Sequence, residues 1–282
     1  MIKLIKNKSY DARLNTDVCD EYNNAELTIT MKLAFKQVNP AGGAAKGTYH
    51  NYGDPRERLK NIVKWNPLEW QAWIKNFENT AQKYWHGKFW LLNNSSQFEY
   101  LAKGNKYIPN VWCRFELIAK DASAIADPHH TIEVVRLDPS ERWFGSHSLL
   151  YDNLDTQATL KGRDSKGNRI MQIAHIHEVG HLLGLEHVDI GKPHCPRAGN
   201  TNLGPCYGVL DVNKNSVMGM GMQLRPEHAT PWRLAMIQIA SNWSLKALFT
   251  NFFDWTPKLT RHYPRTPAEV AANTLITTRP KR

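Results

Sequence analysis

Residues 177–187 read His-Glu-Val-Gly-His-Leu-Leu-Gly-Leu-Glu-His, and this stretch predicts the fold around it. Residues four apart on a helix lie on the same face, so a helix here would direct His177 and His181 toward one metal ion. Gly184 follows three residues later, where helices commonly end in a left-handed residue that glycine adopts without a steric clash. The chain can then turn and bring His187 back as a third ligand. Three protein ligands leave the fourth position of a tetrahedral zinc site open to water, which is typical of a catalytic site.

Glu178 adds a carboxylate next to the first of these histidines. In an H-E-x-x-H helix this carboxylate acts as the general base of zinc hydrolases. Two histidines four apart also occur on solvated or core faces of helices, so the short motif alone has little specificity. The longer pattern is far more specific. It predicts a Zn²⁺ site formed by His177, His181 and His187, with His194 as the alternative third ligand.

The pattern H-E-x-x-H-x-x-G-x-x-H resembles the zinc signature of the metzincin metallopeptidases. Metzincins also have a methionine turn after a variable stretch, and Met218 in residues 216–222, here called the methionine turn, fits this role. The resemblance implies that Gly184 and Met218 support the site structurally. In the astacin and serralysin branches a tyrosine ligand lies two residues after this methionine, whereas here that position is Met220. The subfamily is therefore not identified.

The resemblance implies an α/β fold of the α+β type, arranged as a two-lobed zinc peptidase. A mixed sheet, a long packing helix and the active-site helix would form an N-terminal lobe up to about residue 184. A smaller C-terminal lobe from about residue 185 would carry His187, the methionine turn and a last helix that starts at Thr230. Residues 1–250 would then be the catalytic domain, and residues 251–282 a tail that packs on it or extends from it.

Local sequence patterns place the main helices. Asn66 and Pro67 predict a helix start, with Glu69 able to reach back as in a capping box. Apolar and aromatic residues then recur at helical spacing until Gly87, and we interpret this aromatic stripe as core. The zinc helix is expected from about residue 168 to residue 183, with His175 as a core residue.

Alternating apolar and polar residues predict strands, and clusters of turn-forming residues predict loops. In the metzincin-like arrangement, the last predicted strand would form the sheet edge that pairs with an extended substrate. The turn formers of residues 39–53 predict a loop. The strands are expected at residues 26–38, 88–92, 111–119, 131–137 and 146–151.

Four cysteines are too few for a disulfide scaffold. Cys195 and Cys206 bracket a Gly/Pro/Asn-rich part of the long irregular loop at residues 188–215, where a bridge would restrain the segment; two free thiols are the alternative. A bridge would place the protein outside a reducing cytosol. Cys19 is either incidental or a latch over the zinc.

The net charge of +10 comes from scattered Lys and Arg residues, so charge alone selects no partner. The N-terminus lacks the apolar core of a secretory signal peptide, and no apolar run is long enough to span a membrane. We expect a protein or peptide substrate, no nucleic-acid partner and no membrane span, and the oligomeric state is open. The expected location is extracellular or reached by a non-classical export route, with the cytoplasm as the alternative.

The expected function is that of a zinc-dependent endopeptidase, in which zinc activates a water molecule. Glu178 would take the proton of that water and pass it to the leaving amine. One setting for such an enzyme is a secreted or delivered toxin or effector protease. The alternative from another class is a non-catalytic, zinc-containing binding or adhesive module. The intact Glu178 argues against this alternative, because a pure binder needs no base beside the metal.

Overall fold

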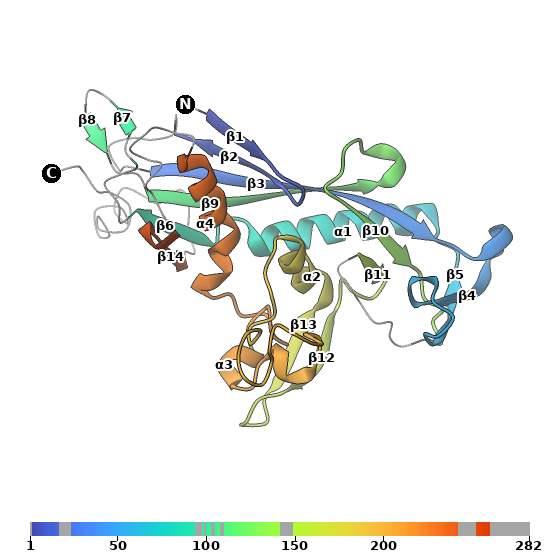
Figure 1. Cartoon of the computed structure of the whole chain (residues 1–282). Helices are drawn as coiled ribbons and strands as arrows, with labels where there is room; N and C mark the ends of the chain where they lie inside the picture. Colours follow the sequence, from blue (N-terminus) through green and yellow to red (C-terminus); the bar gives the residue numbers. More distant parts are fainter. Residues whose placement is uncertain are drawn as a thin grey trace. The chain divides into compact units, whose positions relative to one another are not determined.

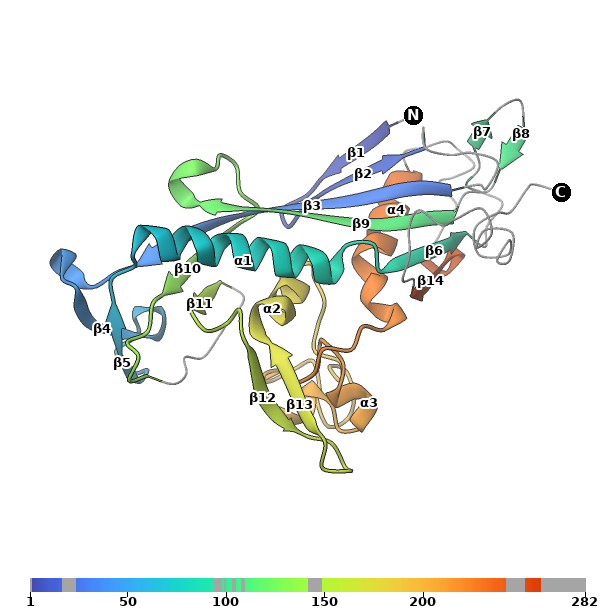
Figure 2. The same ribbon diagram turned by 180° about the vertical axis from the view of Figure 1, so that it is seen from behind.

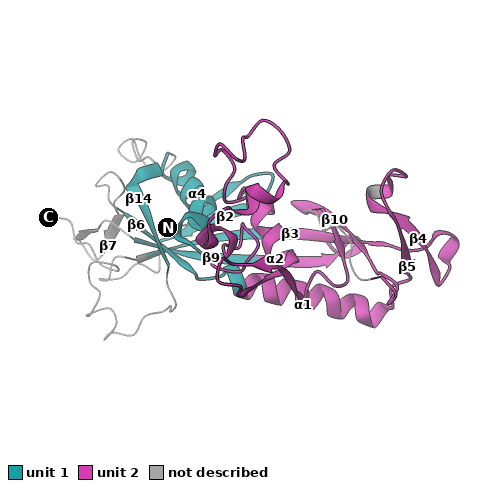
Figure 3. Ribbon diagram, turned by 90° about the horizontal axis from the view of Figure 1, so that it is seen from below, with its two compact units in different colours: residues 1–31, 84–116, 224–282 teal, residues 32–83, 117–223 magenta. Residues whose placement is uncertain are grey.

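The computed structural model describes residues 2–16, 24–93, 98, 100–102, 105–107, 110–141, 149–241 and 252–259. Cys19, residues 146–148 and residues 260–282 of the expected tail lie outside this part of the chain. The protein forms two compact units, which Figure 3 shows in different colours. Residues 1–31, 84–116 and 224–282 form the first unit, and residues 32–83 and 117–223 form the second. The expected lobe boundary at about residue 185 falls inside the second unit, and the division into lobes stays a prediction.

The first unit is built on strands in the order β1-β2-β3-β9-β6-β14. Antiparallel pairing joins β1, β2 and β3, and likewise β9, β6 and β14. A separate antiparallel hairpin consists of β7 and β8. The bounds are β1 Ile2–Lys6, β2 Asp11–Asn15, β3 Asn24–Val38, β6 Phe89–Asn93, β7 Tyr100–Ala102, β8 Asn105–Tyr107, β9 Asn110–Asp121 and β14 Trp255–Leu259, with β3 and β9 contributing residues to both units.

Helix α4 (Thr230–Ser241) belongs to the first unit and starts at the residue predicted for the last helix. Trp232 is fully buried, and its indole N–H donates to the carbonyl of Arg114 on β9 at 2.8 Å. The hydroxyl of Tyr10 donates to the carbonyl of Pro231 at 3.3 Å. These bonds fix the start of α4 against the strands, because each satisfies a polar group that packing removes from water.

In the second unit, the end of β3 pairs in parallel with β10 (His130–Val135). β10 in turn pairs in parallel with β11 (Leu150–Asp152). Parallel pairing here and antiparallel pairing in the first unit confirm the prediction of an α/β fold with a mixed sheet. Among the described strands, β11 pairs only with β10, as an edge strand does, and it overlaps the described end of the strand predicted at residues 146–151.

Helix α1 (Pro67–Trp85) matches the predicted packing helix. Its first turn is capped by the side chain of Asn66, whose oxygen accepts the N–H of Leu68 at 2.9 Å. Phe77 of the aromatic stripe packs edge-on against Phe35 of β3 and Tyr151 of β11, with ring centroids 4.8 and 5.4 Å apart. The stripe is therefore core, as predicted. Figure 1 and Figure 2 show α1 running beside β10, with α2 (Ala174–Leu182) next to it.

The prediction of a zinc helix from residue 168 was wrong at its N-terminal end. Residues 169–173 form β13 (Arg169–Ile173), which pairs antiparallel with β12 (Ala158–Arg163). Burial along β13 alternates, with Ile170 and Gln172 inside. The apolar residues before α2 fit both a helix and a strand, so periodicity did not separate the two. The hairpin turn is stabilised by Asp164, whose carboxylate accepts the N–H of Asn168 at 2.8 Å.

The prediction of a loop at residues 39–53 was also wrong in part. Short 3₁₀ turns occur at residues 41–43 and 51–53, and β4 (Lys46–His50) lies between them, paired antiparallel with β5 (Leu59–Val63). None of the side chains of β4 is buried, and its sequence carries no apolar alternation. Its strand conformation comes from backbone pairing with β5. None of the helices in the described ranges combines the length and apolar character needed to cross a membrane.

Candidate metal centre

The motif helix α2 ends in the way its glycine predicts. Gly184 has a φ of 93°, in the left-handed region where a side chain would be strained. The N–H of Leu185 donates to the carbonyl of Gly180 at 3.0 Å, which closes the last turn of the helix. The chain reverses direction here, and three residues later His187 returns toward the helix.

The three motif histidines lie together in the second unit. The Nε2 atom of His181 is 3.1 Å from that of His177 and 3.0 Å from that of His187. All three ligand atoms lie within 4.8 Å of one another. Ligands about 2.05 Å from a tetrahedral metal ion would be roughly 3.3 Å apart, so the spacings from His181 to the other two histidines are close to those of a tetrahedral metal site. The cluster is therefore positioned to bind a metal ion.

Each of these imidazoles is oriented through its other nitrogen by a backbone carbonyl. A carbonyl can only accept, so every Nδ1 carries the proton and every Nε2 keeps a lone pair for a metal. This fixes the tautomer as well as the ring orientation. The three bonds are His177 Nδ1 to the Val217 oxygen at 2.7 Å, His181 Nδ1 to the Leu185 oxygen at 2.8 Å, and His187 Nδ1 to the Thr201 oxygen at 2.9 Å.

The electrostatics of the cluster favour neutral imidazoles. Burial lowers the pKa of His177 well below its ordinary value, with the neighbouring His181 adding to the effect. Burial, followed by the proximity of His187, lowers the pKa of His181 to about 4. Burial also lowers the pKa of His187. Metals bind the neutral form of histidine, so the cluster is in its ligand form at neutral pH.

His175 is a core residue, as predicted. It is fully buried, and its Nε2 lies 2.7 Å from the hydroxyl of Thr80 on α1. Its Nδ1 lies 3.1 Å from the carbonyl oxygen of Asp155. The ring also packs against Phe77, with centroids 4.7 Å apart. These contacts anchor the start of α2 in the core and leave His175 outside the histidine cluster.

Tyr207 contacts the cluster, although the sequence pattern did not single it out. It ends the short 3₁₀ helix Gly204–Tyr207, and its ring packs on His187 with centroids 3.9 Å apart. Its ring also stacks on His177 at 6.0 Å. Burial first, and then the negative charge of Glu178, raises the pKa of Tyr207 to about 12. Glu178, a residue only 8 % exposed, therefore carries its charge near the tyrosine that packs on the third histidine.

The methionine turn is held by backbone bonds around Met218. Met218 is buried, and its carbonyl accepts the N–H of Val188 at 3.1 Å, which fixes the residue that follows His187. A Cβ on Gly219 would approach the Asn213 carbonyl oxygen to 2.2 Å, so the turn needs glycine there to pack this closely. Met218 therefore lies in a tightly packed turn that is bonded to the residue after the third histidine. Its supporting role stays a prediction.

Gln172 of β13 connects the hairpin to the methionine turn, and sequence analysis missed it because this segment read as helix. Its side chain is buried, and its amide donates to the carbonyl of Gly219 at 2.9 Å. The same nitrogen lies 3.3 Å from Nδ1 of His177. The amide thus satisfies a buried carbonyl directly beside the first motif histidine.

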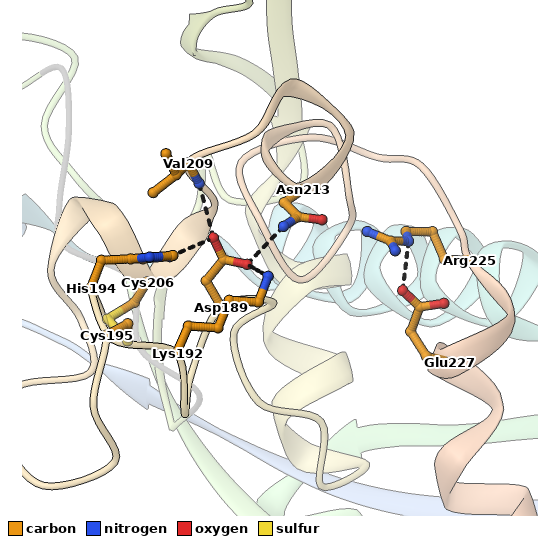
Figure 4. A network of polar contacts seen from close by, with 9 residues as sticks. All are labelled: Asp189, Lys192, His194, Cys195, Cys206, Val209, Asn213, Arg225 and Glu227. Atoms are coloured by element: carbon orange, nitrogen blue, oxygen red, sulfur yellow. Dashed lines mark hydrogen bonds and ion pairs between the residues drawn. A yellow bond between two sulfur atoms is a disulfide. The ribbon is translucent and has the colours of Figure 1, made fainter.

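The loop at residues 188–215 is tied down in two ways. Cys195 and Cys206 form a disulfide, which confirms one of the two alternatives for this pair. The second tie is the buried carboxylate of Asp189, which receives several donors (Figure 4). One of them is Nε2 of His194, at 2.9 Å, so the alternative third ligand is bound to Asp189. Figure 4 also shows an ion pair of the first unit, in which Arg225 lies 2.6 Å from Glu227.

Comparisons of the chain with protein-family models, with curated proteins and with solved structures found no match. The geometry itself therefore defines the class of site. The protein is a mixed α/β chain in which His177, His181 and His187 lie close enough to bind one metal ion.

Proposed function

We propose that the chain is a zinc-dependent endopeptidase of the metzincin type. The convergence of three buried or half-buried Nε2 atoms, with Glu178 adjacent to His177 on the same helix, supports this proposal most strongly. His177, His181 and His187 would hold the ion, and Met218 would support them from the methionine turn. When bound, zinc lowers the pKa of a water molecule at its open position and polarises the substrate carbonyl.

Glu178 is the residue that would move the proton. Its carboxylate would accept a proton from the attacking water and later donate it to the nitrogen of the leaving amine. The carboxylate is largely removed from solvent, and charge interactions are stronger in such surroundings than in water. Tyr207 and the three imidazoles would exclude water from the faces of the site that they cover.

The test is the variant Glu178→Gln, with Glu186→Gln as the matched control. Glu186 belongs to the same motif, but its side chain is half exposed and pairs with Arg197. The first variant should bind zinc in the wild-type ratio and lose about 10²–10⁴-fold in peptide turnover, since this is the usual contribution of a general base. The second should behave as wild type in both measurements.

Turnover of Glu178→Gln near the wild-type rate would contradict the assignment of the base. A wild-type chain that binds zinc but cleaves nothing in a diverse peptide library, with or without added zinc, would favour the binding module. Loss of activity on chelation and its return on addition of zinc would support the peptidase.

We also propose that the protein works outside a reducing cytosol, either secreted or delivered as an effector. The Cys195–Cys206 disulfide supports this, because such bridges persist mainly in oxidising compartments. Cys113 is buried, and burial raises the pKa of its thiol well above the ordinary value, so it is poorly suited to exchange with the bridge. Alkylation of the protein isolated from its native source without reductant tests this location. If Cys195 and Cys206 both react as free thiols, the proposed location is contradicted.

A further inference from the structure

His187 is the one motif histidine that α2 does not carry. His177 and His181 are fixed by a regular helix, whereas His187 depends on the segment that follows it. Its Nδ1 is bonded to the carbonyl of Thr201, which lies in the loop closed by the Cys195–Cys206 disulfide. The site therefore requires that the loop at residues 188–215 be held in one conformation.

Asp189, two residues after His187, is the central polar residue of this loop. It is 1 % exposed, and its carboxylate receives the backbone N–H of Val209 at 3.0 Å and the side-chain amide of Asn213 at 2.8 Å. It also receives Nε2 of His194 and the ammonium of Lys192. These four donors come from both ends of the loop, and all four point at one carboxylate in Figure 4.

The backbone of Asp189 adds a fifth bond. Its N–H donates to the carbonyl of Cys206 at 3.1 Å. Cys206 and Val209 lie on either side of Tyr207 along the chain, so both flanks of Tyr207 are bonded to Asp189. This bracket holds the segment that places the Tyr207 ring on His187, with centroids 3.9 Å apart.

We propose that Asp189 is a positioning residue for the third metal ligand. Its backbone N–H holds Cys206 and its carboxylate holds Val209 and α3 (Asp211–Lys214), so that the ring of Tyr207 and the carbonyl of Thr201 enclose His187 in its ligand orientation. Partners behind a metal ligand typically change metal affinity by about 10–100-fold when they are removed. The inference rests on the proposed metal binding of His187, but not on peptide hydrolysis.

The carboxylate is chemically required, which makes Asp189→Asn the informative variant. An ionised carboxylate only accepts and can receive all four donors, whereas an amide has the same shape but carries two donor hydrogens. Those hydrogens would face other donors, and the clamp would open. The variant should bind zinc about 10–100-fold more weakly than wild type, measured by competition with a chromophoric chelator. The absorption spectrum of the Co²⁺-loaded protein should also change, because the third imidazole leaves its position.

Asp138→Asn is the matched control. This carboxylate accepts two bonds from Ser140 and one from Lys46, so its variant loses a comparable set of partners in the same unit. None of these residues belongs to the histidine cluster, so the variant should keep the wild-type zinc affinity and Co²⁺ spectrum. If Asp189→Asn fails to fold by circular dichroism, Asn213→Ala removes one donor and keeps the carboxylate. It should weaken zinc binding by a smaller factor than Asp189→Asn would.

A folded Asp189→Asn protein with wild-type zinc affinity and an unchanged Co²⁺ spectrum would overturn the proposal. Where only Asn213→Ala folds, unchanged zinc affinity in that variant would do the same. A lower melting temperature without a change in affinity would show a role in stability alone and would also overturn it. Failure of the proposed function is distinguishable, since it appears in the wild-type chain as absent zinc binding or absent hydrolysis.

Discussion

Removing the disulfide should destabilise the second unit by an amount set by the size of the ring it closes. Cys195 and Cys206 are separated by 11 positions in sequence, and both residues are buried. In the chain-entropy description, a ring of this length contributes about 3 kcal/mol to the free energy of unfolding, by restricting the unfolded chain. The double variant Cys195→Ser, Cys206→Ser should lose about that amount. It should also bind zinc more weakly, because Thr201 lies inside the ring and orients His187.

The assay is urea unfolding followed by circular dichroism, for wild type and the double variant, each with and without a phosphine reductant. Reductant should lower the stability of wild type to that of the double variant and leave the double variant unchanged, which is the internal control. Peptide mapping without reductant first establishes that the starting protein is bridged. A bridged wild type whose stability changes by less than about 0.5 kcal/mol on reduction would refute the reasoning, since the ring would then constrain nothing.

Three further predictions concern the zinc site and the core. Zinc at a hundredfold excess over the wild-type Kd should stabilise the wild type by about 2.7 kcal/mol in thermal unfolding. An equal gain in His187→Ala at the same zinc concentration would exclude that residue as a ligand. Gln172→Leu leaves a buried carbonyl of the methionine turn without its donor, so urea unfolding should show a loss of about 1–3 kcal/mol. Burial, and then the charge of Arg225, lowers the pKa of His228 to about 4. The unfolded chain therefore binds the extra proton first as pH falls from about 6.5 to 4, and the contribution of His228 to stability should fall by up to about 3 kcal/mol over that window. His228→Gln should lose that part of the pH dependence, whereas the part that comes from His177, His181 and His187, whose pKa values burial also lowers, should remain.

The parts of the structure that sequence analysis anticipated are those fixed by local chemistry. Asn66 caps α1 because its side-chain oxygen reaches the N–H of Leu68, only two residues away. Gly184 ends the motif helix because its own backbone conformation excludes other residues. The histidine cluster follows from the helical spacing of His177 and His181 and from the sharp turn at Gly184, which together bring the three imidazoles close to one another.

The parts that sequence analysis missed depend on long-range contacts. β4 is a strand only because β5 pairs with it, and its side chains, none of which is buried, give no periodic signal. β13 has an apolar sequence that fits both helix and strand, and its pairing with β12 decides between them. Tyr207 reaches His187 across twenty positions of irregular loop, so no spacing rule could connect the two. The one signal in the sequence was that Tyr207 follows Cys206, because a disulfide at Cys206 would hold its neighbour in place within the loop.

The backbone carbonyls behind the three histidines have a consequence for any mutational survey of this protein. Val217, Leu185 and Thr201 contribute only their main-chain oxygens to the imidazoles. An alanine scan through these positions would leave all three acceptors in place and would report them as unimportant to the metal. Substitutions at Val217 and Leu185 act on the site through packing, since both side chains are buried, whereas a change in the length of the chain moves an acceptor away from its imidazole. Insertions and deletions between residues 185 and 217 should therefore weaken metal binding more than substitutions there.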